Sequence, residues 1–261
     1  MSNVQIAFLL SAFAGLATGL GSIIALAHRR PGPRFLGASL GLSAGVMIFV
    51  SMMELVPKGR QLVAGTLGDH RAGWVVLGAF LLGVLLVALI DRMVPSEINP
   101  HEPLDSEAYR RALLMRTGMM TAVALAIHNF PEGFATFMAA IADPTLGLSV
   151  AIAVAIHNIP EGVAVAVPVY QATGSRQRAF WYSFTSGLAE PFGALIGYLV
   201  LAPYLSDMVT GITFAGIAGI MVFVSVDELL PSAHEFGEHH AAVYGVMGGM
   251  AVMGVTLLIL G

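Results

Sequence analysis

The stretch 126–163 contains one phrase written twice, Ile127-His128-Asn129-Phe130-Pro131-Glu132-Gly133 and then Ile156-His157-Asn158-Ile159-Pro160-Glu161-Gly162. Histidine and glutamate are four positions apart, so a helix places both on one face; asparagine points about 100° away. Proline removes a helical hydrogen bond and bends the helix, and the glycine after glutamate lets another backbone come close. Each phrase therefore predicts a bent helix that presents an imidazole, an amide and a carboxylate at one level.

Composition places the chain in the membrane. Of its 261 residues, 57% are hydrophobic and only 11% are charged, whereas a soluble domain carries about 25% charged residues. Apolar stretches of about 20 residues recur along the whole length, which predicts an all-α polytopic membrane protein surrounded by lipid. The absence of cysteine excludes disulfides and thiolate metal sites. With one lysine and no basic patch, nothing indicates a nucleic-acid partner.

Hydropathy and loop residues predict eight transmembrane spans within one transporter domain, 1–261. A polar loop, 91–116, separates the third and fourth spans, and a tight turn at 142–145 joins the fourth and fifth. The expected spans are about 4–27, 35–56, 73–90, 117–141, 146–169, 179–203, 207–230 and 241–260.

Orientation follows from the lysines and arginines in the loops, which gather on the cytosolic side of a membrane protein. The loops after the first, third and fifth spans hold nine of these residues, and the opposite side holds three. The nine are Arg29, Arg30, Arg34, Arg92, Arg110, Arg111, Arg116, Arg176 and Arg178, and the three are Lys58, Arg60 and Arg71. We therefore expect both termini outside the cytosol.

A second repeat is inverted. Residues 45–57 of the second span match residues 219–231 of the seventh, and residues 14–18 of the first match residues 186–190 of the sixth. The second span runs outward and the seventh inward, so the two halves are related by an axis in the membrane plane. Such inverted repeats are typical of transporters whose substrate binds near the midplane. The predicted organisation is three spans, a central hairpin and three spans.

The two histidines are expected at the same depth. His128 lies 15 residues before Asp143 at the hairpin turn, and His157 lies 14 residues after it. With a rise of 1.5 Å per residue, both imidazoles lie about 21–23 Å from the turn. They are therefore level with each other and inside the bilayer core.

Three glutamates, Glu132, Glu161 and Glu190, lie equally deep without any accompanying lysine or arginine. An ionised group at that depth costs roughly 2.5–3.5 kcal/mol on insertion scales, so these carboxylates need a proton or a metal ion as countercharge. Two histidines, two asparagines and three glutamates without thiolate suit Zn²⁺, Fe²⁺, Mn²⁺ or Cd²⁺. The ligands outnumber those of one tetrahedral ion, which favours two adjacent ions bridged by Glu132 and Glu161.

The paired phrases HNFPEG and HNIPEG, together with SGLAEP at 186–191 and an eight-span layout, resemble the ZIP family of divalent metal transporters over essentially the whole chain. The resemblance is strongest to its bacterial zinc-uptake branch. It implies uptake of Zn²⁺, with Fe²⁺, Mn²⁺, Cd²⁺ and Co²⁺ as further substrates, across a bacterial inner membrane. It implies no enzymatic activity and no cofactor, and it leaves a homodimer open.

The resemblance also implies how the ligands are divided. His128, Glu132, His157 and Glu161 would hold one ion, and Asn129, Asn158 and Glu190 would complete a second site that shares Glu132 and Glu161. Three further residues are candidates for the ion pathway, namely Met47, Glu54 and Glu228.

Other interpretations remain open at this point. Intramembrane histidine and asparagine often serve helix packing, Glu190 could be a protonated buried acid, and Met47 could be a core residue. Glu54 and Glu228 could be simple interfacial acids. A membrane-embedded metal-dependent hydrolase is the main alternative function, although the sequence lacks HExxH. A metal sensor would be expected to carry a soluble output domain, of which the chain shows no sign.

Overall fold

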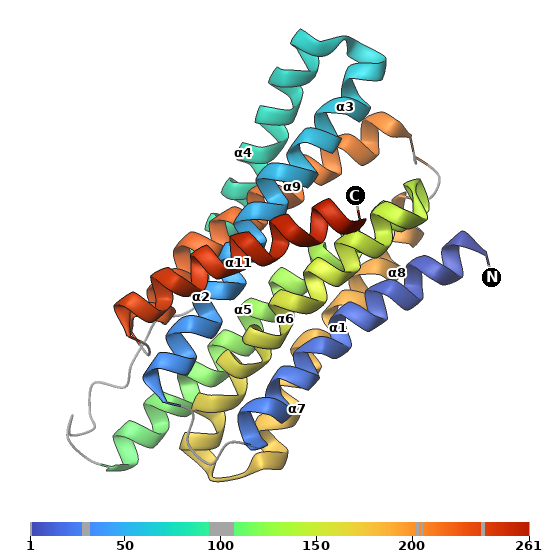
Figure 1. The fold of residues 1–261 in the computed structure, drawn as a ribbon. Helices are drawn as coiled ribbons and strands as arrows, with labels where there is room; N and C mark the ends of the chain where they lie inside the picture. The colour runs from blue at the N-terminus through green and yellow to red at the C-terminus, as the bar shows by residue number, and fades with distance from the viewer. Residues whose placement is uncertain are drawn as a thin grey trace.

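The structure is a computed structural model that describes residues 2–27, 32–93, 107–201, 204, 206–235 and 238–260. Within these ranges the chain is helical apart from a few connecting residues and contains no strand, as the composition predicts. Six helical segments in the described part are long and apolar enough to cross a membrane, namely 3–27, 34–67, 69–90, 144–173, 207–234 and 239–259. The protein is therefore an all-helical, multi-pass membrane protein (Figure 1).

The described helices account for most of the chain. In chain order they are α1 (Asn3–Ala27), α2 (Pro33–Val50), the π-helical turn η1 (Ser51–Leu55), α3 (Val56–Leu67), α4 (Asp69–Met93), α5 (Glu107–Ala142), α6 (Pro144–Thr173), α7 (Arg176–Gly187), α8 (Ala189–Leu201), α9 (Asp207–Val224), the π-helical turn η3 (Ser225–Leu229), α10 (Leu230–Glu235) and α11 (His239–Leu260).

Several helices extend beyond the predicted spans. α5 begins at Glu107 rather than near 117, because the residues before the apolar run are good helix formers. The predicted polar loop is correspondingly shorter: α4 continues to Met93, and residues 94–106 lie outside the described part. The second span was expected to end near 56, but helix continues to Leu67 through Pro57.

The prolines of the second and seventh spans are preceded by π-helical turns. In η1 the N–H of Val56 bonds to the carbonyl of Ser51, and in η3 the N–H of Leu230 bonds to the carbonyl of Ser225. This wider turn, with bonds from i to i+5, lets the helix pass a proline that would otherwise clash with the preceding turn. The matching sequences 45–57 and 219–231 thus share the same irregularity.

Two of the eight predicted spans, 117–141 and 179–203, fall on helices in their described residues but are not among the six segments. The first lies within α5, whose N-terminal part is polar. The second is divided into α7 and α8 at Leu188. Pro191 cannot donate to the carbonyl of Gly187, so regular helix is interrupted at this point. The count of eight spans stays a prediction.

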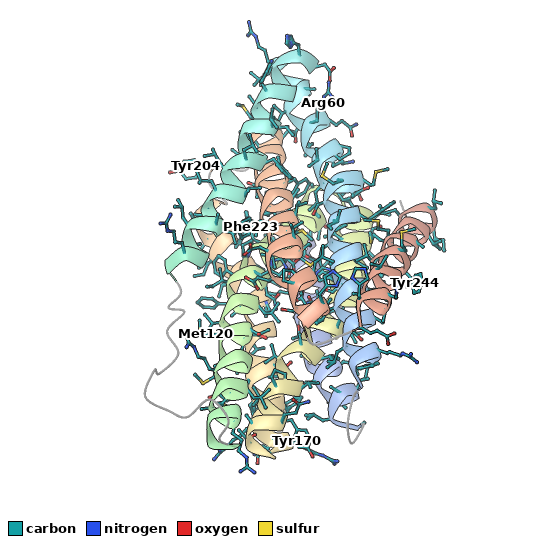
Figure 2. All side chains as sticks on the ribbon, turned by 90° about the vertical axis from the view of Figure 1, so that its left-hand side faces the viewer. Arg60, Met120, Tyr170, Tyr204, Phe223 and Tyr244 are labelled. Carbon is teal, nitrogen blue, oxygen red and sulfur yellow. The ribbon has the colours of Figure 1, made fainter. Side chains whose placement is uncertain are left out.

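The helices pack in two groups that meet at α2 and α6. In one group α6 lies between α1 and α5, and α7 and α8 pack against these helices. In the other, α2 lies along α11, and α9 packs against α3 and α4 (Figure 1). Arg60 and Tyr170 mark opposite ends of the molecule (Figure 2). The largest apolar core draws on both groups, with Phe137 from the first and Met47 and Phe214 from the second.

Candidate metal centre

The hairpin of α5 and α6 brings the two phrases to one level. Asp143 caps α6: its side chain accepts hydrogen bonds from the N–H groups of Thr145, at 2.7 Å, and Leu146. Pro144 occupies the first turn, where its missing N–H leaves no bond unmade. The predicted tight turn is thus present. All seven predicted ligands are at most 1% exposed, namely His128, Asn129, Glu132, His157, Asn158, Glu161 and Glu190.

Glu132 lies between the two imidazoles. Nε2 of His157 is 3.1 Å from both carboxylate oxygens of Glu132, and Nε2 of His128 is 3.1 Å from Oε1. Glu161 Oε1 lies 3.9 Å from Nε2 of His128. The ligand atoms of His128, Glu132 and His157 all lie within 4.8 Å of one another. These nitrogen and oxygen atoms are close enough together for one divalent ion to bind several of them at once.

The two asparagines are held by their amino groups. Nδ2 of Asn129 donates to the carbonyl of Ser186 at 3.2 Å, and Nδ2 of Asn158 donates to the carbonyl of Ala14 at 2.9 Å and to Oε1 of Glu190. Because every partner is an acceptor, the nitrogen must face it and the amide oxygen must point elsewhere. Both Oδ1 atoms lack a hydrogen-bond partner among the described residues. Two amide oxygens are thus free to bind a cation.

Further polar atoms in the centre are also unpaired within the described part of the chain. They are both ring nitrogens of His128, Nδ1 of His157, Oε2 of Glu161 and Oε2 of Glu190. His128 Nε2 is near Glu132, but the geometry is not that of a hydrogen bond. An unpaired buried polar group costs about 1–3 kcal/mol. No lysine or arginine is buried among the described residues, so this cluster of carboxylates is suited to a cation.

The glycine that follows glutamate in each phrase lies in close contact with the backbone of a neighbouring helix, as the sequence predicts. A Cβ at Gly133 would overlap the backbone carbonyl of Glu190 on α8, and one at Gly162 would overlap the carbonyl of Thr18 on α1. The contact is completed from the other side, because Gly193 meets the carbonyl of Phe130. The glycine of the first phrase thereby brings Glu190 against the centre.

The second helix group reaches the centre through α2, at a residue that the sequence did not single out. Ser43 is fully buried, and its hydroxyl lies 3.3 Å from the carbonyl of His157 and 3.4 Å from Oε1 of Glu161. The sulfur of Met47, also fully buried, is 3.9 Å from this hydroxyl. Ser43 lies one turn before Met47 on the same face, and that spacing is the signal that could have identified it.

The two outer acids are placed differently. Glu228 in η3 is partly buried, and its charge acts on the imidazole of His128. Glu54 in η1 is partly buried as well, but the charge acting on it is that of Lys58 at the start of α3.

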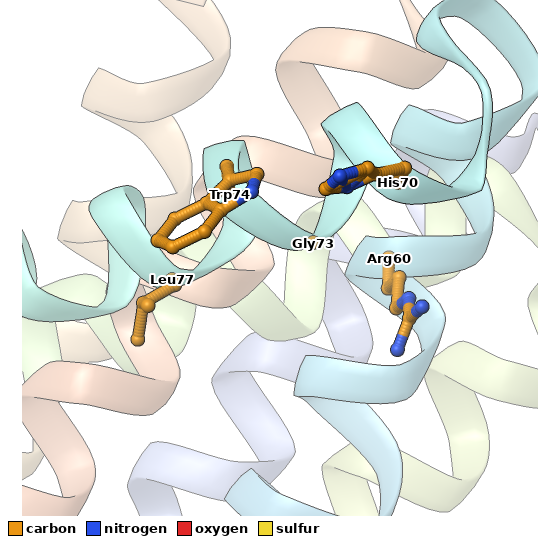
Figure 3. A pocket seen from close by; sticks show the side chains of 5 residues that line it. All are labelled: Arg60, His70, Gly73, Trp74 and Leu77. Carbon is orange, nitrogen blue, oxygen red and sulfur yellow. The ribbon is translucent and has the colours of Figure 1, made fainter.

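A surface pocket at the α3–α4 end is separate from this centre. It is lined by Arg60, His70, Gly73, Trp74 and Leu77 (Figure 3). None of the predicted ligands contributes to its wall, so the pocket and the buried centre are different features.

Known proteins resemble the chain along its whole length. A family model described as "ZIP Zinc transporter" matches residues 95–257. A protein of Corynebacterium aurimucosum named "Zinc transporter ZupT" is 56% identical over 259 residues, which cover 98% of each chain. Proteins of the same name from Streptococcus mutans and Oceanobacillus iheyensis are 52% and 53% identical, and cover 97% and 100% of each chain.

Proposed function

The chain belongs to the ZIP family of zinc transporters, so it is a divalent-metal transporter rather than an enzyme, and we propose that the ion crosses the membrane through the buried centre on α5, α6 and α8. Zn²⁺ is the principal substrate, with Fe²⁺, Mn²⁺, Cd²⁺ and Co²⁺ as the further ions to be compared. The hydrolase alternative is set aside because the family transports metal ions.

One observation carries the proposal. His128, Glu132 and His157 bring their ligand atoms within 4.8 Å of one another in a fully buried position. Imidazole and carboxylate suit borderline and hard divalent ions, and oxygen-rich ligation without thiolate is compatible with a carrier that must release its cargo. A buried site of this kind in a ZIP-family protein is best explained as a binding position for the transported ion.

We assign the ligands to two ion positions. His128, His157, Glu132 and Glu161 hold the first ion. The unpaired amide oxygens of both asparagines, together with Glu190, support a second position that shares Glu132 and Glu161. The charges of Glu132 and Glu161 also act on Glu190, which a bound cation between them would offset.

The pathway to and from these positions uses α2 and the π-helical turns η1 and η3. Met47 lies beside Ser43, which touches the centre. Glu228 acts electrostatically on His128, which supports a role next to the first ion on the cytosolic side. Glu54, at the matching place in η1, is proposed as the acid at the outer entrance.

We further propose one transporter domain, 1–261, with eight spans in a three-two-three order. The paired glycine contacts support this order: α8 meets the first phrase at Gly133 and Gly193, as α1 meets the second at Gly162 and Gly21. The shared π-helical turns of the second and seventh spans support it as well.

In a bacterial inner membrane both termini would lie outside the cytosol. Exposed apolar side chains on α4 and α11, such as Trp74, Leu82 and Leu258, would face lipid, and a homodimer would have to cover one of these faces. Because the chain has no cysteine, single cysteines report orientation directly. At the exposed positions Thr66 and Gln177, an impermeant maleimide added to intact cells should label Thr66→Cys but not Gln177→Cys. The reverse pattern would invert the topology.

The decisive test is metal uptake into proteoliposomes that contain the purified chain. We expect Zn²⁺ uptake above that of empty liposomes, its loss in His128→Ala, and its retention in His70→Ala, which removes an exposed histidine on α4. Equal uptake by the native chain and His128→Ala would contradict transport through the buried centre. Competition by Fe²⁺, Mn²⁺, Cd²⁺ and Co²⁺ at fixed Zn²⁺ ranks the substrates.

A further inference from the structure

α1 and the α7–α8 segment hold the two phrases in matching ways. Nδ2 of Asn158 donates to the carbonyl of Ala14, and Nδ2 of Asn129 donates to the carbonyl of Ser186. Ala14 and Ser186 are 172 positions apart in the chain, and so are Thr18 and Glu190. The two asparagines occupy the same place in their phrases, so α1 accepts a hydrogen bond from the second phrase in the same way as α7 accepts one from the first.

The correspondence extends to the glycine of each phrase. A Cβ at Gly133 would overlap the backbone carbonyl of Glu190, and a Cβ at Gly162 would overlap that of Thr18. Thr18 therefore occupies, against the second phrase, the place that Glu190 occupies against the first. Glu190 is the proposed ligand of the second ion, which raises the question of what its counterpart does.

The Thr18 hydroxyl has no hydrogen-bond partner among the residues that the structure describes. Thr18 is fully buried, and its Oγ1 makes no hydrogen bond with any described residue. Other hydroxyls on α1 are bonded: Ser11 donates to the carbonyl of Gly133 at 3.0 Å, and Ser22 donates to the carbonyl of Gly19 at 2.7 Å. Buried threonines commonly bond back to their own helix, so the unpaired hydroxyl of Thr18 points to a group other than protein.

The direction of this hydroxyl is given by its neighbour on α7. A Cβ placed on Gly187 would lie 2.9 Å from Thr18 Oγ1. Gly187 directly follows Ser186, whose carbonyl holds the side chain of Asn129. The hydroxyl therefore faces α7 next to Ser186, the residue that holds Asn129, whose own Oδ1 is unpaired. The correspondence of Thr18 with Glu190 assigns the hydroxyl to the side of the second ion position that faces α1.

We propose that Thr18 lines the second ion position opposite Glu190 and holds, through its hydroxyl, a water molecule bound to that ion; this rests on the two-ion function proposed above. A hydroxyl has one donor and two acceptor sites, and a buried water needs at least two polar partners. The ion and the hydroxyl supply them. The second ion then has a carboxylate on the α8 side and an exchangeable water on the α1 side, which keeps it releasable.

The first test compares ion stoichiometry and affinity in the full-length protein in detergent, by equilibrium dialysis against Zn²⁺. Thr18→Val keeps the shape and removes the hydroxyl; it should weaken the second ion about five- to tenfold, the effect of one lost hydrogen bond, and leave the first ion unchanged within about twofold. Thr18→Ser should restore native affinity. Thr210→Val, at a buried threonine on α9, is the matched control and should bind both ions like the native chain.

A second test measures whether residue 18 lies close to the bound ion, rather than how tightly the ion binds. It does not require that Thr18→Val folds. Because the chain has no cysteine, Thr18→Cys introduces the single thiol of the molecule. With two equivalents of Cd²⁺ it should give an ultraviolet thiolate-to-cadmium charge-transfer band, and Thr210→Cys should give none.

The outcomes separate the two proposals. Binding of only one Zn²⁺ by the native chain would overturn the two-ion function, and the role of Thr18 with it. Two ions in the native chain, a weakened second ion in Glu190→Ala, and an unchanged second ion in Thr18→Val would overturn the role of Thr18 alone. Equal weakening of both ions in Thr18→Val, without rescue by Thr18→Ser, or absence of the cadmium band in Thr18→Cys, would do the same.

Discussion

The substitution Gly133→Ala tests how tightly α8 is held against the centre. A Cβ at Gly133 would overlap the carbonyl oxygen and carbon of Glu190, and both are backbone atoms that cannot rotate away. Ordinary contact between such atoms is about 3.5–4.0 Å, so α8 must move by roughly 1 Å or more. The displaced residue is Glu190 itself, so its carboxylate moves with the backbone.

The magnitude has two parts. Overpacking a close contact costs about 1–3 kcal/mol, and replacing glycine inside a helix with alanine returns about 0.5–1 kcal/mol; we therefore expect Gly133→Ala to lower the free energy of unfolding by about 1–2 kcal/mol. Metal binding should be affected more strongly than stability, because a ligand must be held to within about 0.5 Å of its productive position and the expected shift of α8 exceeds that tolerance. The second ion should be lost while the first is retained.

The assay pairs Zn²⁺ stoichiometry with thermal unfolding of the metal-free protein in detergent. The matched control is Gly65→Ala on α3, where a Cβ meets no atom within 4 Å, and which should bind two ions and unfold no earlier than the native chain. If Gly133→Ala bound two ions with native affinity at unchanged stability, the close contact between α5 and α8 would not be what positions Glu190.

The remaining predictions concern the ligands and protons. Glu132→Ala or Glu161→Ala should abolish Zn²⁺ uptake into proteoliposomes, because each of these glutamates is a ligand at both ion positions. Glu190→Ala removes a ligand of the second position only, so it should change affinity or selectivity more than it abolishes transport. Equal and complete loss of uptake in all three variants would argue for one shared site. Protons compete with metal for the imidazoles of His128 and His157, so equilibrium binding in detergent should weaken by roughly tenfold or more between pH 7.5 and 5.5, and a flat profile would contradict both as ligands.

The repeated phrase made the convergence of these buried side chains predictable because helical spacing is a local property. The four-residue separation of His128 and Glu132 and the short hairpin determine depth and facing direction without any long-range information. The glycine after each glutamate predicted a close backbone approach, which the contacts of Gly133 confirm. The choice of partner helix also follows from a sequence match, that between residues 14–18 and 186–190.

What the sequence did not reveal depends on contacts between distant helices or on compensating turns. Ser43 reaches Glu161 only because α2 crosses α6 at that level; its position one turn before Met47 indicates a shared face but not which helix lies opposite. The extension of α5 to Glu107 was missed because hydropathy detects the bilayer rather than the helix, and polar helix formers continue the helix beyond it. The continuation through Pro57 was missed because a widened turn accommodates the ring.

The widened turns at η1 and η3 also have a consequence for rotational phase. Each of these turns contains one residue more than a regular α-helical turn. One residue corresponds to about 100° of rotation about the helix axis. Beyond η1 this rotation turns Gly59 of α3 onto Gly211 of α9, where a Cβ on either glycine would meet the other's carbonyl oxygen. Deleting one residue from 51–55 would therefore close the widened turn to a regular α-helical turn and leave the side chains of α3 facing as they do now. Straightening the turn at unchanged length would instead rotate every side chain of α3 by about a quarter turn and take Gly59 away from Gly211. The widened turn thus determines the direction in which α3 presents its residues.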